Sequence, residues 1–86
     1  MIFEYDPNKS RSNKLKHGID FDKAQKLWED ERMVELSALF EKEKRYLNIG
    51  KIDGKFYTVI TTYRGESIRI ISARRSRKKE IALYES

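Results

Sequence analysis

Hydrophobic and polar residues in the first third of the chain predict one strand followed by two helices. Residues 2–5 alternate apolar and polar side chains, which is typical of a short strand. Asp6 and Pro7 favour the start of a helix, as N-cap and first helical residue, and Gly18 favours its end. This helix is almost wholly polar and should be exposed. Asp20 is a second N-cap, after which apolar residues recur at helical spacing. We therefore expect a second, amphipathic helix packed on a sheet.

From Arg32 onward the period of the pattern changes to two, which predicts strands. Asp53-Gly54 is a strong hairpin signal, and Gly65 marks another turn. A further turn is expected between Leu39 and Lys44. The predicted strands and the final helix are Met33–Leu36, Arg45–Ile52, Phe56–Arg64, Ser67–Arg74 and the helix Ser76–Tyr84. The order β-α-α-β-β-β-β-α predicts an α+β fold with an antiparallel meander.

Composition limits the class of protein. Eighty-six residues predict a single domain over residues 1–86. No apolar run approaches the roughly 20 residues of a membrane span, and no signal peptide is recognisable, so we expect no membrane partner and a cytoplasmic location. The chain has no cysteine and one histidine, and its acids show no metal-binding spacing. We therefore expect neither a metal site nor a cofactor.

Positive charge is concentrated in the second half of the chain. The net charge is +5 overall, but residues 44–86 alone carry +7 and hold six of the eight arginines. Such an asymmetry indicates a surface that faces a polyanion, because the guanidinium fork matches phosphate geometry. The phenol rings of Tyr46, Tyr57 and Tyr63 could stack on bases between these cations. The alternative is a solvated sheet edge, with arginines paired to Glu29, Asp30, Glu31 or Glu66.

Simple alternation places the arginines of the last strand on different faces. Arg69 would lie with Ile71 and Ala73, and Arg74 would lie on the opposite face at the end of the strand. We therefore expect Arg69 and Arg74 not to share a face.

RNA cleavage without a metal needs three functions. A base takes the proton of the 2′-hydroxyl, cations stabilise the charge on the pentacoordinate phosphorus, and an acid protonates the leaving oxygen. Arginine can supply only the second, because it stays charged. Proton transfer is left to Glu43, His17, a lysine or a tyrosine, and one histidine excludes a two-histidine mechanism within one subunit.

Two groups of residues resemble the BrnT toxin family, and together they cover nearly the whole chain. The first group is Phe3-Glu4-Tyr5-Asp6-Pro7-Asn8-Lys9, Asn13-Lys14-Leu15-Lys16-His17-Gly18-Ile19, Phe21 and Ala24. The second is Glu43, Arg45, Ile49-Gly50, Arg64, Ile68-Arg69-Ile70-Ile71-Ser72-Ala73-Arg74-Arg75, Glu80 and Tyr84. The order and spacing of these segments make the resemblance specific.

The resemblance implies a RelE-like fold and a ribonuclease toxin of a type II toxin–antitoxin system that inhibits translation by cleaving RNA. It also implies a BrnA-type ribbon-helix-helix antitoxin, with two toxins on an antitoxin dimer, and DNA contacted only through that antitoxin. The expected catalytic residues are Glu43, Arg45, Arg64, Arg74 and His17. The expected RNA-binding residues are Lys14, Lys16, Arg69, Arg75 and Tyr63. We expect alanine at Arg64 or Arg74 to leave folding intact and to remove toxicity. The alternative function is a non-catalytic basic module that binds RNA or a protein.

Overall fold

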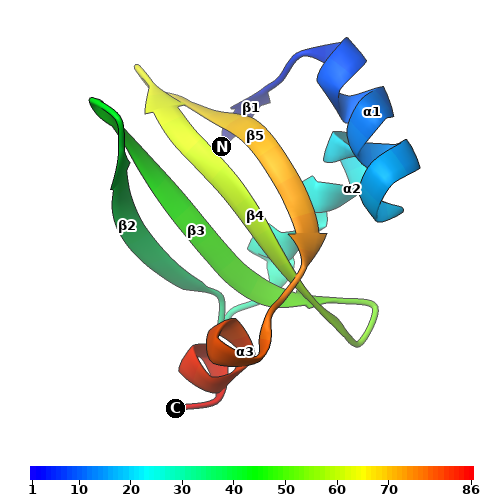
Figure 1. Ribbon diagram of the computed structural model, residues 1–86, viewed down its shortest axis with the longest axis vertical. Helices are drawn as coiled ribbons and strands as arrows, with labels where there is room; N and C mark the ends of the chain where they lie inside the picture. The colour runs from blue at the N-terminus through cyan, green and yellow to red at the C-terminus, as the bar shows by residue number, and fades with distance from the viewer.

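The computed structural model describes residues 1–86 and confirms the α+β class (Figure 1). One five-stranded sheet has the strand order β1-β5-β4-β3-β2. Its strands are β1 (Ile2–Glu4), β2 (Val34–Phe40), β3 (Glu43–Ile52), β4 (Lys55–Arg64) and β5 (Ser67–Arg75). The helices are α1 (Pro7–His17), α2 (Phe21–Ala24), the 3-10 helix η1 (Gln25–Glu29) and α3 (Lys78–Glu85). The meander from β2 to β5 is antiparallel as predicted, and β1 adds a parallel strand beside β5.

Local capping chemistry sets the bounds of α1. The Asp6 carboxylate accepts a hydrogen bond from the Asn8 N–H at 2.8 Å, and Pro7 is the first helical residue. Gly18 ends the helix with a φ of 75°, a conformation that glycine adopts without a steric penalty. Asn13 then joins the helix to β5, because its amide donates to the Ala73 carbonyl at 2.8 Å. The helix is polar along its exposed side, as the sequence predicts.

The second predicted helix is only partly α-helical. Its N-cap is Asp20, which accepts from the Lys23 N–H at 2.8 Å, but α2 spans four residues and continues as the 3-10 helix η1. Phe21, Ala24 and Leu27 on one side are nonetheless fully buried against the sheet. The apolar pattern therefore predicted the buried side correctly, although the backbone tightens after Ala24.

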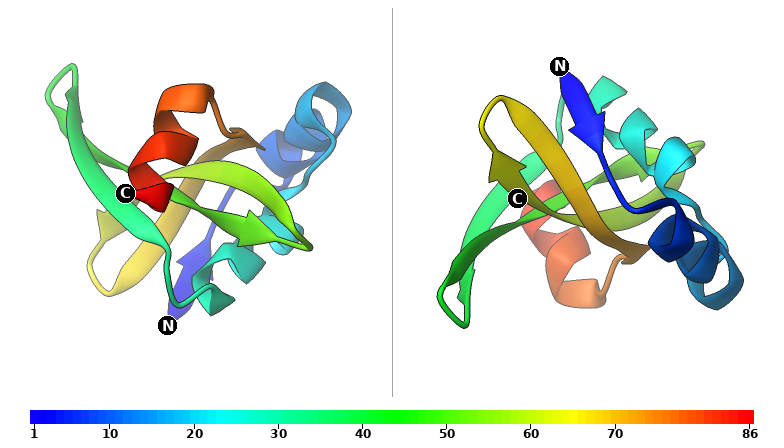
Figure 2. Two further views of the ribbon diagram at one scale, coloured as in Figure 1. Left: turned by 90° about the horizontal axis from the view of Figure 1, so that it is seen from below. Right: turned by 90° about the horizontal axis from the view of Figure 1, so that it is seen from above.

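The sheet separates two helical layers, which Figure 2 shows from both ends. The α2–η1 segment covers one face, and α3 lies on the other. The main core lies under the first face, and we call this the core face. Its buried residues are Ile19, Phe21, Ala24, Leu27, Ile52, Tyr57, Val59, Ile70 and Ala73. No helix is both long enough and apolar enough to cross a membrane.

The turns of the meander lie where the sequence predicts them. Asp53 and Gly54 have φ values of 52° and 78° and join β3 to β4 as a two-residue hairpin. The ambiguous segment before β3 holds a turn at Glu41, with a φ of 57°. Strand β2 continues to Phe40 and is therefore longer than predicted.

A β-bulge in β5 overturns the predicted placement of two arginines. Ile60 pairs with Ser72 and Thr61 pairs with Ile70, so Ile71 has no partner in β4. Arg69 pairs with Thr62 and Arg74 pairs with Thr58. Because Thr58 and Thr62 lie an even number of residues apart in β4, their partners share the face opposite the core face. The prediction that Arg69 and Arg74 lie on different faces is therefore wrong.

Candidate functional site

Strands β3 and β4 separate at one end of the sheet. Their last paired residues are Tyr46 and Thr61, and beyond them the Thr62 hydroxyl donates to the Lys44 carbonyl at 3.0 Å. Figure 1 shows the tip of the β2–β3 hairpin standing apart from the tip of the β4–β5 hairpin. The backbone ladder between β3 and β4 therefore ends before the tips of the two hairpins. We call this region the open end of the sheet.

A cavity of about 150 Å³ lies at the open end, and its lining brings four of the predicted residues together. We call it the arginine cavity, and its lining residues are Lys9, Glu43, Arg45, Thr62, Arg64, Arg69 and Ile71. Four cations from β3, β4, β5 and α1 thus surround one carboxylate. An excess of cations in a concave site favours the binding of an anion such as a phosphate.

Two of the arginines in this cavity are held in place. The Arg45 guanidinium donates to the Glu43 carboxylate at 3.2 Å and lies 4.4 Å from the centre of the Phe40 ring. Arg69 forms an ion pair with Glu4 at 3.7 Å. These carboxylates come from the strands themselves, and not from the four acids that the solvated-edge alternative named. The contacts restrain two of the side chains that line the cavity.

The other two cations of the cavity form no ion pair. Arg64 is exposed at the end of β4, and Lys9 is exposed in the first turn of α1. Lys9 belongs to a segment that carries the family resemblance, but it was not among the predicted site residues. It reaches the cavity because β1 pairs with β5, which carries α1 alongside the strand that holds Arg69.

Arg74 lies away from this cavity, in a hydrogen-bond network that holds α3. Both of its terminal nitrogens donate to Glu80, each at 2.8 Å, and Glu80 also accepts from the Thr58 hydroxyl at 3.0 Å and the Arg77 N–H at 2.7 Å. The Arg74 guanidinium is the main cause that lowers the pKa of Glu80 to about 2. Five residues of strand, about 15 Å, separate Arg74 from Arg69.

The predicted residues of α1 also lie away from the arginine cavity. His17 is at the last turn, about 12 Å along the helix axis from Lys9. Lys16 is exposed near it, and Lys14 lines a separate shallow cavity with other residues of α1. Arg75, at the far end of β5, donates to a backbone carbonyl and lies 5.6 Å from the centre of the Tyr57 ring.

Tyr63 lies at the open end, but on the core face of the sheet. Its ring meets that of Tyr46 edge to face, with centres 4.9 Å apart, and its hydroxyl donates to Glu35 at 2.9 Å. The Glu35 carboxylate raises the pKa of Tyr63. A second cavity, of about 430 Å³, lies beside this tyrosine pair.

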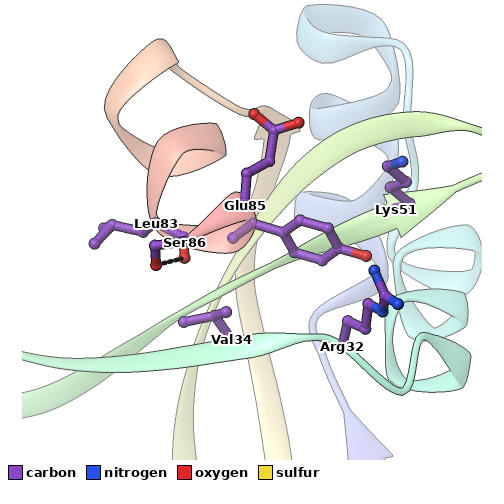
Figure 3. Close-up of a pocket in the computed structure, with 7 residues that line it drawn as sticks. Arg32, Val34, Lys51, Leu83, Glu85 and Ser86 are labelled. Carbon is purple, nitrogen blue, oxygen red and sulfur yellow. Dashed lines mark hydrogen bonds between the residues drawn. The ribbon is translucent and has the colours of Figure 1, made fainter.

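The largest cavity, of about 790 Å³, lies beside the end of α3 and contains none of the predicted residues (Figure 3). Arg32 and Lys51 approach it with Tyr84, whose hydroxyl donates to Asp30 at 2.8 Å. Burial opposes ionisation of Asp30, but hydrogen bonds from the N–H groups of Arg32 and Lys51 lower its pKa below the ordinary value. This arrangement secures α3 to the sheet. Nowhere do three or more His, Cys, Asp or Glu side chains form a group that could hold a metal ion.

Comparison with known proteins identifies the family. A search of curated proteins finds no match. The family described as "Ribonuclease toxin, BrnT, of type II toxin-antitoxin system" matches residues 5–80, which include every lining residue of the arginine cavity. The chain therefore belongs to the BrnT family of ribonuclease toxins of type II toxin–antitoxin systems.

Proposed function

We propose that this chain is a metal-independent endoribonuclease that cleaves RNA in the arginine cavity. The observation that carries the proposal is the convergence of Arg45, Arg64 and Arg69 with one carboxylate, Glu43, at the open end of the sheet. Family membership supplies the reaction class, a ribonuclease, and the cavity supplies charges that suit a phosphodiester. The proposed catalytic residues therefore all line one cavity.

The chemistry follows from the groups in the cavity. Glu43 accepts the proton of a ribose 2′-hydroxyl, and the 2′-oxygen forms a bond to phosphorus. Arg45, Arg64 and Arg69 stabilise the additional negative charge that develops on the phosphoryl oxygens. The bond between phosphorus and the 5′-oxygen then breaks, and the ammonium group of Lys9 donates a proton to the leaving oxygen. The products are a 2′,3′-cyclic phosphate and a free 5′-hydroxyl.

The remaining predicted residues take other roles in this proposal. Arg74 acts through Glu80 to position α3, since its guanidinium is already bonded to that carboxylate. The cations of α1 and Arg75 attract the RNA chain on either side of the scissile phosphate. His17 is the alternative proton acceptor, and its distance from the arginine cavity makes Glu43 the favoured one.

The biological setting follows from the resemblance to the BrnT family. Membership of a family of ribonuclease toxins from type II toxin–antitoxin systems implies an antitoxin partner and an RNA target. We propose further that the fold is RelE-like, that cleavage inhibits translation in the cytoplasm, and that the partner is a BrnA-type ribbon-helix-helix antitoxin. In that arrangement an antitoxin dimer carries two toxins and alone contacts DNA.

A cleavage assay in the presence of EDTA tests the proposal. The purified chain should cut cellular RNA into fragments that end in 2′,3′-cyclic phosphates. Arg64→Ala should cleave at least about 100-fold more slowly, as expected when one group that stabilises the transition state is removed. Lys79→Ala removes an exposed cation of α3 and serves as the matched control. Salt-sensitive RNA binding without cleavage would instead establish the alternative function, a non-catalytic basic module.

A further inference from the structure

Two cavities at the open end of the sheet share part of their lining. The arginine cavity and the 430 Å³ cavity beside Tyr63 are both lined by Glu43, Thr62 and Arg64. We call the second one the tyrosine cavity, and its other lining residues are Lys42, Lys44, Tyr46 and Tyr63. The two hollows therefore meet at the gap between β3 and β4.

We propose that the substrate is single-stranded RNA that passes through this gap, with an unpaired base next to the scissile phosphate stacked on Tyr63. The proposal rests on the proposed function and adds a substrate class and a base-binding subsite to it. The first observation that supports it is that the two cavities are lined by side chains from opposite faces of the sheet. Arg69 and Thr62 lie on the face opposite the core, whereas Tyr63 and Tyr46 lie on the core face. A strand that occupies both cavities must therefore cross the end of the sheet.

The tyrosine pair forms a rigid, partly open surface. Tyr63 is 47% exposed, which leaves much of its ring free for contact with a base. The edge-to-face contact with Tyr46 and the hydroxyl bond to Glu35 restrain the ring. A base that stacks on a ring already fixed in place loses less conformational entropy than one that must order the side chain. Stacking on aromatic rings is the usual way in which proteins bind unpaired bases.

The charge and size of the tyrosine cavity suit a nucleotide. Lys42, Lys44 and Arg64 line it, and Glu43 is its single carboxylate. The Lys44 ammonium lies 6.0 Å from the centre of the Tyr46 ring, so a cation is present beside the aromatic surface. A volume of about 430 Å³ falls within the range of about 300–1,000 Å³ that is typical of pockets for small molecules. The cavity can therefore hold a base while the cations contact the adjoining phosphates.

Base pairing is incompatible with this path. In a duplex the bases stack on one another inside the helix, and turning one toward a protein ring would cost its pairing and stacking. A folded RNA could enter only at a loop, a bulge or an end. The same argument predicts that binding depends little on which base is present, because every base has an aromatic face that can stack. The lining of the tyrosine cavity also contains no Asn or Gln side chain that could recognise the edge of one particular base.

A structural role for Tyr63 is the competing explanation, because its hydroxyl joins β4 to Glu35 in β2. The two explanations differ in the part of the side chain that matters. Stacking requires the ring and not the hydroxyl, whereas the link to Glu35 requires the hydroxyl. Tyr63→Phe keeps the ring and removes the bond, and Tyr63→Leu keeps an apolar side chain without an aromatic face.

Binding of an RNA that cannot be cleaved provides the test. The probe is a fluorescein-labelled 12-nucleotide oligouridylate with 2′-O-methyl groups throughout, used alone or annealed to its complement, and binding is followed by anisotropy. The single strand should bind at least about tenfold more tightly than the duplex. Tyr63→Leu should weaken binding of the single strand by about 5- to 100-fold, and Tyr63→Phe by less than about twofold. Urea unfolding of each variant verifies that the fold is retained.

The outcomes separate this inference from the proposed function. Equal affinity for single strand and duplex, or unchanged binding by Tyr63→Leu, would overturn the subsite. A binding loss in Tyr63→Phe as large as that in Tyr63→Leu would also overturn it, in favour of the structural role. Because the probe has no free 2′-hydroxyl, these results do not depend on catalysis. A chain that shows the expected binding but cuts no RNA would refute the enzyme and leave the subsite standing.

Discussion

Replacing Glu80 by glutamine tests how α3 is fixed to the sheet. The Glu80 carboxylate accepts from both terminal nitrogens of Arg74, from Thr58 and from the backbone of Arg77. Its side chain is only 10% exposed. Glutamine keeps the shape of the side chain but carries no charge, so the comparison isolates the contribution of the ionised carboxylate.

The magnitude follows from the pKa of Glu80, which is about 2 in the folded chain and 4.5 ordinarily. Because folding lowers this pKa, the carboxylate stabilises the folded state above pH 4.5, and that contribution is lost as the pH falls toward 2. A shift of this size corresponds to about 3 kcal/mol at neutral pH. About 1 kcal/mol should be left at pH 3 and less at pH 2.

Urea unfolding between pH 7 and pH 2 measures this contribution. The difference in free energy of unfolding between the natural chain and Glu80→Gln should be nearly constant from pH 7 to pH 5 and should then shrink by about 3 kcal/mol. Glu85→Gln changes an exposed glutamate of the same helix that forms no ion pair, and it serves as the matched control. Parallel curves for Glu80→Gln and the natural chain would refute the reasoning.

The same contacts change what we expect of Arg74→Ala. From sequence alone this variant should fold normally and lose toxicity. In the structure it leaves the Glu80 charge largely buried without its main partner, which costs about 3–5 kcal/mol in comparable cases. A loss of toxicity in Arg74→Ala therefore supports a catalytic role only when the variant is shown to be folded at the temperature of the assay.

Two further substitutions test how the layers are joined. Asn13→Ala removes hydrogen bonds to the carbonyls of Ile19 and Ala73 and should lower the free energy of unfolding by about 1–3 kcal/mol. Urea unfolding measures this change, and an unchanged midpoint would show that α1 is not held by this residue. Gly50→Ala places a Cβ 3.1 Å from both Asp30 Oδ2 and Leu27 Cδ1 and should cost about 1–3 kcal/mol, seen as a lower melting temperature. A variant as stable as the natural chain would mean that η1 moves without cost.

Features set by adjacent residues could be predicted from the sequence. Asp6 and Gly18 mark the two ends of α1. The Asp6 carboxylate accepts a hydrogen bond from a free N–H at the start of the helix, and Gly18 adopts the left-handed conformation at its end. The Asp53-Gly54 hairpin fixes the register of β3 on β4 in the same way. The pairing of Glu43 with Arg45 was not predicted, because the sequence placed Glu43 in a turn, whereas β3 begins at that residue. The family resemblance rests on the same kinds of local segments.

Features set by distant contacts could not be predicted. The run from Ile68 to Ile71 gives no sign of which residue carries the bulge, because the choice depends on how β5 fits both β4 and α1. The bulge reverses the face of Arg74, which the alternation of residues along β5 does not show. Lys9 joins the arginine cavity only through the pairing of β1 with β5.

The two ends of the sheet differ in how their charges are satisfied, and this difference supports the proposed binding site at the open end. Near α3 the one carboxylate of Glu80 has four donors, and its guanidinium partner is largely buried. At the open end Arg64 and Lys9 form no ion pair, and the cations that line the arginine cavity outnumber its carboxylate. Like charges held close together destabilise the free protein, and a bound polyanion removes that repulsion. RNA and an acidic segment of any partner protein would gain from the same cations. Whichever occupies the arginine cavity must therefore exclude the other.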